Sequence, residues 1–319
     1  MKKVQNPNWI KMKKSLKWIL AFVMLYIGCA LIFVGSGMGH SYIVRQNAQY
    51  ASKTLTVKKA DKNRKKKTSY DAKKTKSISA TELWRARQYP VSPIGRMSIP
   101  VVNIHNPLFA GYGDHNQNLS YGVVTVVPGR QLGAPNTNVV YAGHYMGNYG
   151  PAILDNLHLM QNGDVIYVTD MHRIYAYQAT YKSYAIKPSQ VEVENNEKGK
   201  STITLITCSD FNISKYGYGQ HRTVVKGTLV GSLPATKKNL EKTELTDKEI
   251  QTSITTPVKK DKKVVNPVTK KVVRVRVGSE PKIYQRASFN EIAATFTIIW
   301  GILLLIVLIR IWMPRRTMD

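Results

Sequence analysis

The stretch Ser201–Asp210, STITLITCSD, places a cysteine at the end of an apolar run. Its first six residues are rich in Thr, Ile and Leu, which is the composition of a buried strand. The run then meets a polar Ser-Asp pair and an irregular loop that contains Gly and Tyr. We therefore expect Cys208 at the mouth of a strand, where the backbone is rigid and the side chain can still meet a ligand.

Two further apolar runs border side chains with useful chemistry. Asn138–Tyr141 is followed by His144, and Arg222 directly precedes Thr223–Val230. A cysteine nucleophile needs a thiolate, and a histidine in reach can move the proton and return it to an amine leaving group. A fixed arginine can stabilise the negative charge that develops on the carbonyl oxygen. Together these residue types predict an active site for acyl transfer at an amide.

Each of the three residues also has a structural explanation. Cys208 could be a small core side chain, and Arg222 could pair with an acidic residue on the surface. His144 competes with the other histidines of the chain, which are His40, His105, His115, His158, His172 and His221. The sequence favours His144 because it comes directly after an apolar strand.

The composition predicts a strongly cationic protein without a disulfide framework. The 319 residues carry a net charge of +28, which favours attraction to polyanions. Two long apolar segments argue against nucleic acid as that polyanion. The lysine-rich segment 37–78 is either a solvated spacer or a tether attracted to an anionic surface such as wall polymers or lipid head groups. Of the two cysteines, Cys29 lies in an apolar segment, so Cys208 is expected to be a free thiol. The scattered histidines and the lack of a phosphate-binding glycine motif predict no metal and no cofactor.

The two apolar segments are candidate membrane spans. Residues 18–36 follow a basic tail, residues 1–17, and residues 289–309 precede a second basic tail, residues 310–319. About 20 apolar residues span a bilayer and about 7–15 form a signal-peptide core, so length favours a retained helix over a cleavable signal. Under the positive-inside rule we expect a two-pass protein of the cell membrane, with both termini cytoplasmic and the rest extracellular.

The segments beside these spans are polar and rich in lysine. Residues 37–78 hold few large apolar side chains and are expected to be a disordered extracellular stalk. Residues 233–288 have a similar composition and are expected to be a linker, in which the alternating run Lys270–Val277 could add an edge strand.

Residues 79–232 are left for a globular domain, which is long enough to bury one core. Short apolar runs broken by Gly, Pro and Asn predict a mostly β, closed or nearly closed barrel. The expected strands are 95–104, 122–127, 138–141, 164–169, 173–186, 201–207 and 223–230. Short helices are expected after Ser79, with Glu82 three residues on as in a capping box, and at Ile153–Leu159.

The motif residues resemble a known family. Thr204–Cys208, TLITC, is similar to the T-L-x-T-C signature of the sortases, the membrane-anchored transpeptidases of Gram-positive bacteria. Arg222 at the head of the next strand and Ala142-Gly143-His144 also resemble that family, over residues 90–231. The resemblance implies an eight-stranded sortase barrel, with Cys208 as nucleophile, His144 as general acid and base, and Arg222 as stabiliser of substrate and oxyanion. Thr207 is expected to contact substrate.

The resemblance also implies a reaction. An LPxTG-type sorting signal on a surface protein would be cleaved after Thr, leaving a thioacyl enzyme that an amine on a lipid-linked peptidoglycan precursor resolves. The signature and the N-terminal anchor look like class A, whereas the second span is reminiscent of class C, the pilin polymerases. Tyr89-Pro90-Val91 lacks the Asp-Pro-aromatic motif of the class C lid. The residues after 122–127 hold no acid, so no calcium is expected there.

Two other functions remain open. A plain thiol peptidase or amidase would pass the acyl group to water, and the sequence hardly separates it from a transpeptidase. A non-catalytic cationic membrane protein that binds wall polymers would need no cysteine, and salt would abolish its binding.

Overall fold

The chain forms two compact units in the computed structural model, which describes residues 7–147, 152–211, 219–250, 262–276 and 289–313. One unit, Gly37–Arg286, contains all the described strands. The other combines the terminal segments Met1–Ser36 and Ala287–Asp319. The domain boundaries expected from the sequence remain predictions.

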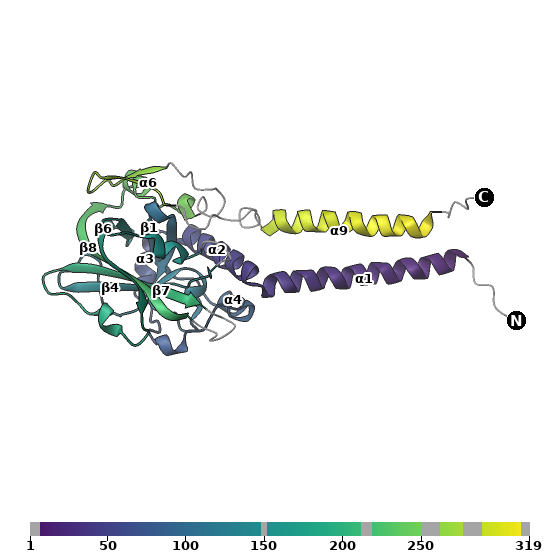
Figure 1. Ribbon diagram of the computed structural model, residues 1–319, viewed down its shortest axis with the longest axis horizontal. Coiled ribbons are helices and arrows are strands. Elements are labelled where there is room, and N and C mark those ends of the chain that lie inside the picture. The colour runs from purple at the N-terminus through teal and green to yellow at the C-terminus, as the bar shows by residue number, and fades with distance from the viewer. Residues whose placement is uncertain (1–6, 148–151, 212–218, 251–261, 277–288, 314–319) are drawn as a thin grey trace. The chain divides into compact units, whose positions relative to one another are not determined.

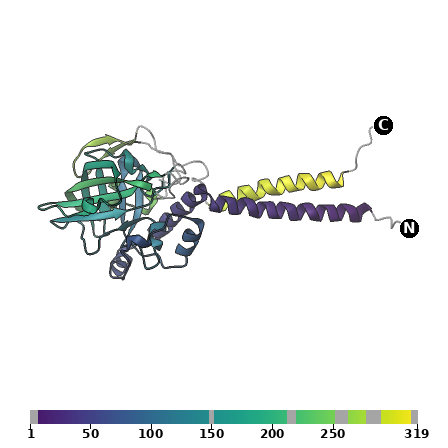
Figure 2. The same cartoon turned by 60° about the horizontal axis from the view of Figure 1, so that its bottom comes forward.

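Eight strands of the first unit close into a barrel in the order β1-β2-β3-β4-β7-β8-β6-β5, seen from two sides in Figures 1 and 2. Neighbouring strands are antiparallel, except that β2 runs parallel to β3 and β4 runs parallel to β7. The strands are β1 Pro93–Ile99, β2 Ile104–Phe109, β3 Val123–Thr125, β4 Thr137–Ala142, β5 Val165–Thr169, β6 Arg173–Ile186, β7 Ser201–Phe211 and β8 Gly219–Pro234. The predicted closed β-barrel is confirmed.

The sequence pattern predicted one strand over residues 95–104. The structure instead has two strands there, β1 and the start of β2, with a turn between them. β1 ends at Ile99, Pro100–Val102 forms a single 3-10 turn, and Asn103 has a φ of 52°. Asparagine enters this left-handed region more readily than most residues. The chain therefore reverses at Asn103, and β2 returns antiparallel to β1.

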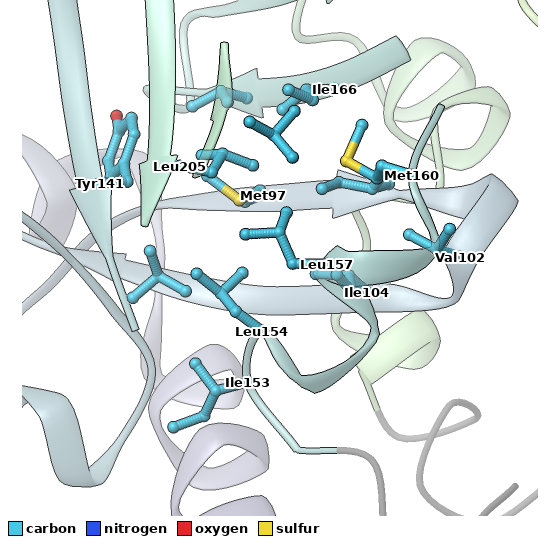
Figure 3. Packing of buried hydrophobic residues seen from close by; sticks show 14 of the residues in the cluster. Met97, Val102, Ile104, Tyr141, Ile153, Leu154, Leu157, Met160, Ile166 and Leu205 are labelled. Carbon is cyan, nitrogen blue, oxygen red and sulfur yellow. The ribbon is translucent and has the colours of Figure 1, made fainter. Parts of the chain in front are cut away.

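Aliphatic side chains fill the barrel interior (Figure 3). Met97 of β1 and Leu205 of β7 point into it, and the segment that carries the 3-10 helix η5 (Asp155–Leu159) adds Leu157 and Met160. All four side chains are fully buried. Burying a side chain of this size stabilises the fold by about 1.5–3 kcal/mol, so this cluster holds the strand ends in fixed positions.

Residues 37–64 are folded, so the expectation of a disordered stalk is wrong here. They form α2 (Gly37–Thr54) and α3 (Val57–Arg64). α2 buries Val44, Ala48 and Ala51, whose spacing of four and three residues places them on one helix face. Most of the lysines that suggested disorder come after this helix, and averaging over the whole segment hid its apolar face.

The segment that follows α3 is fastened to the barrel domain by hydrogen bonds. Thr68 donates its hydroxyl to the Ala110 carbonyl at 2.9 Å, and the Tyr112 amide donates to the Ser69 carbonyl at 2.7 Å. A short 3-10 helix, η1 (Ala72–Lys74), comes next. The helix α4 (Ala80–Ala86) is then capped by the Ser79 hydroxyl, as expected.

The chain also stays packed after the barrel, in the region expected to be a linker. It forms α6 (Lys237–Lys242) and a two-stranded sheet of β9 (Lys263–Val265) and β10 (Val272–Arg274). β10 therefore pairs with β9 and not as an edge strand of the barrel. Leu245 is 1 % exposed, and Arg276 forms an ion pair with the buried Asp164 of the barrel domain.

The second unit is a pair of helices, α1 (Pro7–Gly35) and α9 (Phe289–Trp312), which lie side by side (Figure 1). Both are long and apolar enough to cross a membrane. Three hydrogen bonds join them, Trp312 to Ser15 at 3.1 Å, Trp300 to the Phe22 carbonyl at 3.0 Å, and Tyr26 with Thr297 at 3.0 Å. Residue numbers rise along one helix and fall along the other, so the two helices are antiparallel.

Candidate active site

Three adjacent strands bring the predicted residues to one end of the barrel. β4 and β7 run parallel with Ala142 opposite Ile206, so His144 and Cys208 both follow this pair by two residues. β8 runs antiparallel to β7 and places Arg222 directly opposite Cys208. The arrangement follows from the strand order, with β7 between β4 and β8, together with the register of these two pairs.

The three side chains line one pocket of about 320 Å³. His144, Cys208 and Arg222 all contribute to its wall, as do Gly143 and Thr207. No other histidine in the described part of the chain lines this pocket. The structure thus brings the predicted trio together and separates His144 from the competing histidines.

Two hydrogen bonds fasten the ends of β4 and β7 beside the pocket. The Gly143 amide donates to the Ile206 carbonyl at 3.1 Å, and the Thr207 hydroxyl donates to the Gly143 carbonyl at 2.8 Å. A side chain at Gly143 would meet Ile153 at 2.6 Å, so only glycine fits there. The sequence predicted that Thr207 contacts substrate. In the structure its side chain is only 3 % exposed, and its hydroxyl is hydrogen-bonded to Gly143, the residue before His144.

Cys208 is a partly buried free thiol. Gly219 lies against it, since a Cβ at this glycine would be 2.8 Å from the Cys208 Cβ and 3.5 Å from Sγ. Burial raises the pKa of the Cys208 thiol, and the charge of Arg222 opposes that rise. The thiol is therefore mostly protonated near neutral pH, with Arg222 available to stabilise the thiolate.

His144 is shifted in the opposite direction. Burial lowers the pKa of its imidazole to about 4, so it is neutral near pH 7. A neutral imidazole can accept a proton from the thiol as the sulfur attacks, which is the task of a general base. The resting pocket therefore holds a neutral thiol and a neutral base.

Arg222 keeps its charge available to a ligand. One of its guanidinium nitrogens, Nη1, donates to the carbonyls of Gly219 at 2.8 Å and His221 at 3.1 Å. Within the described ranges it forms no ion pair with a carboxylate. The described residues therefore do not support the alternative that Arg222 forms a surface ion pair. The backbone carbonyls of Gly219 and His221 hold its guanidinium at the pocket wall.

Much of the pocket wall was not expected from the sequence. Ala72 and Thr75, at and just after η1, form part of it, although this segment was expected to be disordered. Tyr112 and Glu194 also contribute, the latter from the 3-10 helix η6 (Val191–Glu194) between β6 and β7. None of these residues lies in a motif, and only their fold places them beside Cys208.

One group outside this pocket has the residue types of a metal site. The ligand atoms of His105, Glu244 and Glu249 lie within 4.8 Å of one another. His105 Nε2 is 2.9 Å from Glu244, whose other oxygen pairs with the Lys262 ammonium at 2.6 Å. Because that ammonium already balances the carboxylate, we assign no metal to this group.

A family model matches the part of the chain that contains these three residues, and the chain also has curated relatives. A family model described as Sortase domain matches residues 97–230. The chain is 33 % identical over 198 residues to Sortase A of Streptococcus agalactiae, covering 61 % of this chain and 78 % of that protein. It is 29 % identical over 220 residues to Sortase A of Bacillus anthracis, covering 69 % and 97 %. A crystal structure of Listeria monocytogenes sortase A matches at 27 % identity with a TM-score of 0.40, covering 47 % of this chain and 96 % of that one.

Proposed function

The chain belongs to the sortase family of cysteine transpeptidases, and on that premise we propose that it cleaves an LPxTG-type sorting signal after Thr and transfers the surface protein to an amine of a cell-wall precursor. Cys208 is the nucleophile, His144 the general acid and base, and Arg222 the stabiliser of the developing oxyanion. The observation that carries the proposal is the single pocket lined by all three side chains.

The reaction runs in two halves. The Cys208 sulfur attacks the threonine carbonyl carbon while its proton passes to His144, and Arg222 donates to the oxygen that gains charge. The carbon–nitrogen bond then breaks, and His144 returns the proton to the leaving amine. In the second half the acceptor amine attacks the thioester, loses a proton to His144, and releases the Cys208 sulfur, which takes the proton back.

The relatives named Sortase A favour class A over class C. Transfer to water in place of an amine would make the enzyme a thiol peptidase. The two outcomes share the thioacyl step, so only the product in the presence of an acceptor separates them.

We also propose that the barrel lies outside the cell, with both termini in the cytoplasm. The antiparallel pairing of α1 with α9 supports this topology, because it places the start of α1 and the end of α9 on one side. Lysines Lys11, Lys13 and Lys14 lie at the first of these ends, and Arg310 at the second. The positive-inside rule assigns that side to the cytoplasm.

The test is mass spectrometry of the purified full chain with a peptide that contains Leu-Pro-x-Thr-Gly. We expect an acyl adduct on Cys208 that disappears when triglycine or another amine is added and an amide product forms. Cys208→Ala should form no adduct, and Cys29→Ala, the matched control for the other thiol, should behave like the natural chain. Cleavage that persists in Cys208→Ala would refute the proposal.

A further inference from the structure

Glu194 is a carboxylate in the pocket wall, and no described residue is a direct partner for its negative charge. Within the described ranges it is the only acidic side chain that lines this pocket, whose wall also contains the cations Lys187 and Arg222. Its carboxylate forms no hydrogen bond or ion pair with any described residue. Burial raises its pKa, and the charge of Arg130 opposes that rise. Burial, followed by the charge of Glu194, raises the pKa of Tyr112, another residue of the same pocket wall, to about 12.

The backbone that carries Glu194 is fixed to the barrel. Arg130 donates from Nη1 to the Glu194 carbonyl at 2.5 Å and to the Asn138 carbonyl at 2.7 Å. The side-chain amide of Asn138 donates to the Val193 carbonyl at 3.1 Å, and the Thr204 hydroxyl donates to the same carbonyl at 3.3 Å. The carboxylate is thus presented from a rigid support, as a recognition group must be.

The same contacts place the backbone next to Glu194 along β7, at a known number of residues from Cys208. Val193 is held beside Thr204, which precedes Cys208 on β7 by four residues. At about 3.3 Å per residue of extended strand, this separation is about 13 Å. An extended substrate has the same rise, so a substrate that runs along β7 would bring its fourth to fifth residue from the bond to the backbone segment that carries Glu194.

The direction of the substrate follows from the length of the motif. The proposed signal has four residues before the cleaved bond, Leu-Pro-x-Thr, and one after it. The wall that contains Ile206, Val193 and Glu194 lies on one side of Cys208, and we assign this side to the longer part of the signal, the part before the bond. The motif itself places leucine at the fourth position, which leaves the fifth, just ahead of the motif, for the carboxylate.

We propose that Glu194 is a specificity-determining residue that selects a lysine or arginine immediately before the Leu-Pro-x-Thr-Gly motif of the substrate. The inference rests on the proposed function and adds a further substrate position to it. A cation there gives Glu194 the partner that it lacks, in a half-buried place where an ion pair is screened less than on the open surface. The substrate would thereby be chosen by charge as well as by its motif.

The competing explanation is that Glu194 only balances the nearby charge of Arg130. If Glu194 only balanced charge, replacing it would change the stability of the protein and would affect the activity toward every substrate to the same extent. A recognition role would change the ratio between a basic and a neutral substrate and leave the neutral one unaffected. Glu192 offers a matched control, since it lies on the same helix η6, is exposed, and does not line the pocket.

The experiment uses the full chain in detergent and peptides that differ only in the residue before the leucine, with Lys, Gln or Glu there. We expect kcat/KM to favour Lys over Gln by about three- to tenfold, as for a partly shielded ion pair, and Glu to be the poorest. Glu194→Gln should reduce the Lys preference to unity, Glu194→Lys should reverse it, and Glu192→Gln should keep it. Moving the lysine along the peptide should give a maximum at this position.

The binding affinity of the same peptides for Cys208→Ala, measured by fluorescence anisotropy, separates this inference from the reaction. A Lys preference in binding that depends on Glu194 supports the inference even if the natural chain forms no thioacyl adduct, a result that would refute only the proposed function. Equal Lys to Gln ratios in the natural chain and Glu194→Gln would overturn the inference. A preference for lysine after the cleaved bond would overturn it as well.

Discussion

Replacing Thr207 by valine should distinguish a role of Thr207 in positioning His144 from a role in contacting substrate. The hydroxyl of Thr207 donates to the Gly143 carbonyl at 2.8 Å, and Gly143 directly precedes His144. Valine keeps the shape of threonine, so the change removes the hydrogen bond without opening a cavity. The buried carbonyl then lacks a partner, which costs about 1–3 kcal/mol.

The loss should be visible in stability and in rate. For a unit of this size about 1 kcal/mol lowers the melting temperature by about 2–4 °C, so we expect a decrease of about 2–12 °C. A small displacement of His144 from the Cys208 sulfur should lower kcat by about 10- to 100-fold. The assays are thermal unfolding in detergent and cleavage of a fluorogenic LPxTG peptide.

The control is Thr207→Ser, which keeps the hydroxyl and should restore both kcat and melting temperature. If the hydroxyl contacted substrate instead, as the sequence led us to expect, the valine variant would have a raised KM with kcat unchanged. That pattern, with an unchanged melting temperature, would refute the positioning role of Thr207.

Three further predictions follow from the site and its support. The thioacylation rate should be flat across neutral pH and should fall in acid as His144, with a pKa of about 4, gains a proton. It should also fall in alkali, above the ordinary thiol pKa, because an ionised Cys208 leaves His144 without the proton that the leaving amine must receive. A measured pH–rate profile with an acid limb near 6.5 would contradict this. Gly219→Ala should lower the adduct yield at least about tenfold in mass spectrometry, because the new Cβ would lie 2.8 Å from the Cys208 Cβ and overpacking costs about 1–3 kcal/mol. Arg276→Ala leaves the buried Asp164 unpaired and should reduce stability by about 3–5 kcal/mol in denaturant titration, whereas Arg276→Lys should lose less; equal loss in both would count against the ion pair.

The sequence predicted the barrel because its strands are short apolar runs between turn residues, a local pattern. The pocket trio was predicted because each member directly borders such a run, and strand ends meet at the rim of a barrel. Asn103, whose φ is 52°, shows where this reasoning is weakest, since a turn inside an apolar run separates two strands without changing composition.

The remainder depended on contacts that no local pattern contains. The buried apolar side chains of α2 are few, Tyr42, Val44, Ala48 and Ala51, and they are recognised as a core face only when the surface that covers them is known. Glu194 lies on a polar loop that resembles any other exposed loop in composition. Its place in the pocket follows from the hydrogen bonds of Arg130, Asn138 and Thr204, which join parts of the chain far apart in sequence.

Ala72 and Thr75 of the N-terminal segment form part of the wall beside the catalytic cysteine, and α2 buries Val44 and Ala51. A truncated enzyme that began at residue 79, where a composition-based boundary falls, would lack both features. It would expose apolar surface to solvent, and its pocket would lack one part of the wall. Substrate selectivity measured on this truncated protein would therefore be that of a wider pocket than the pocket of the whole chain.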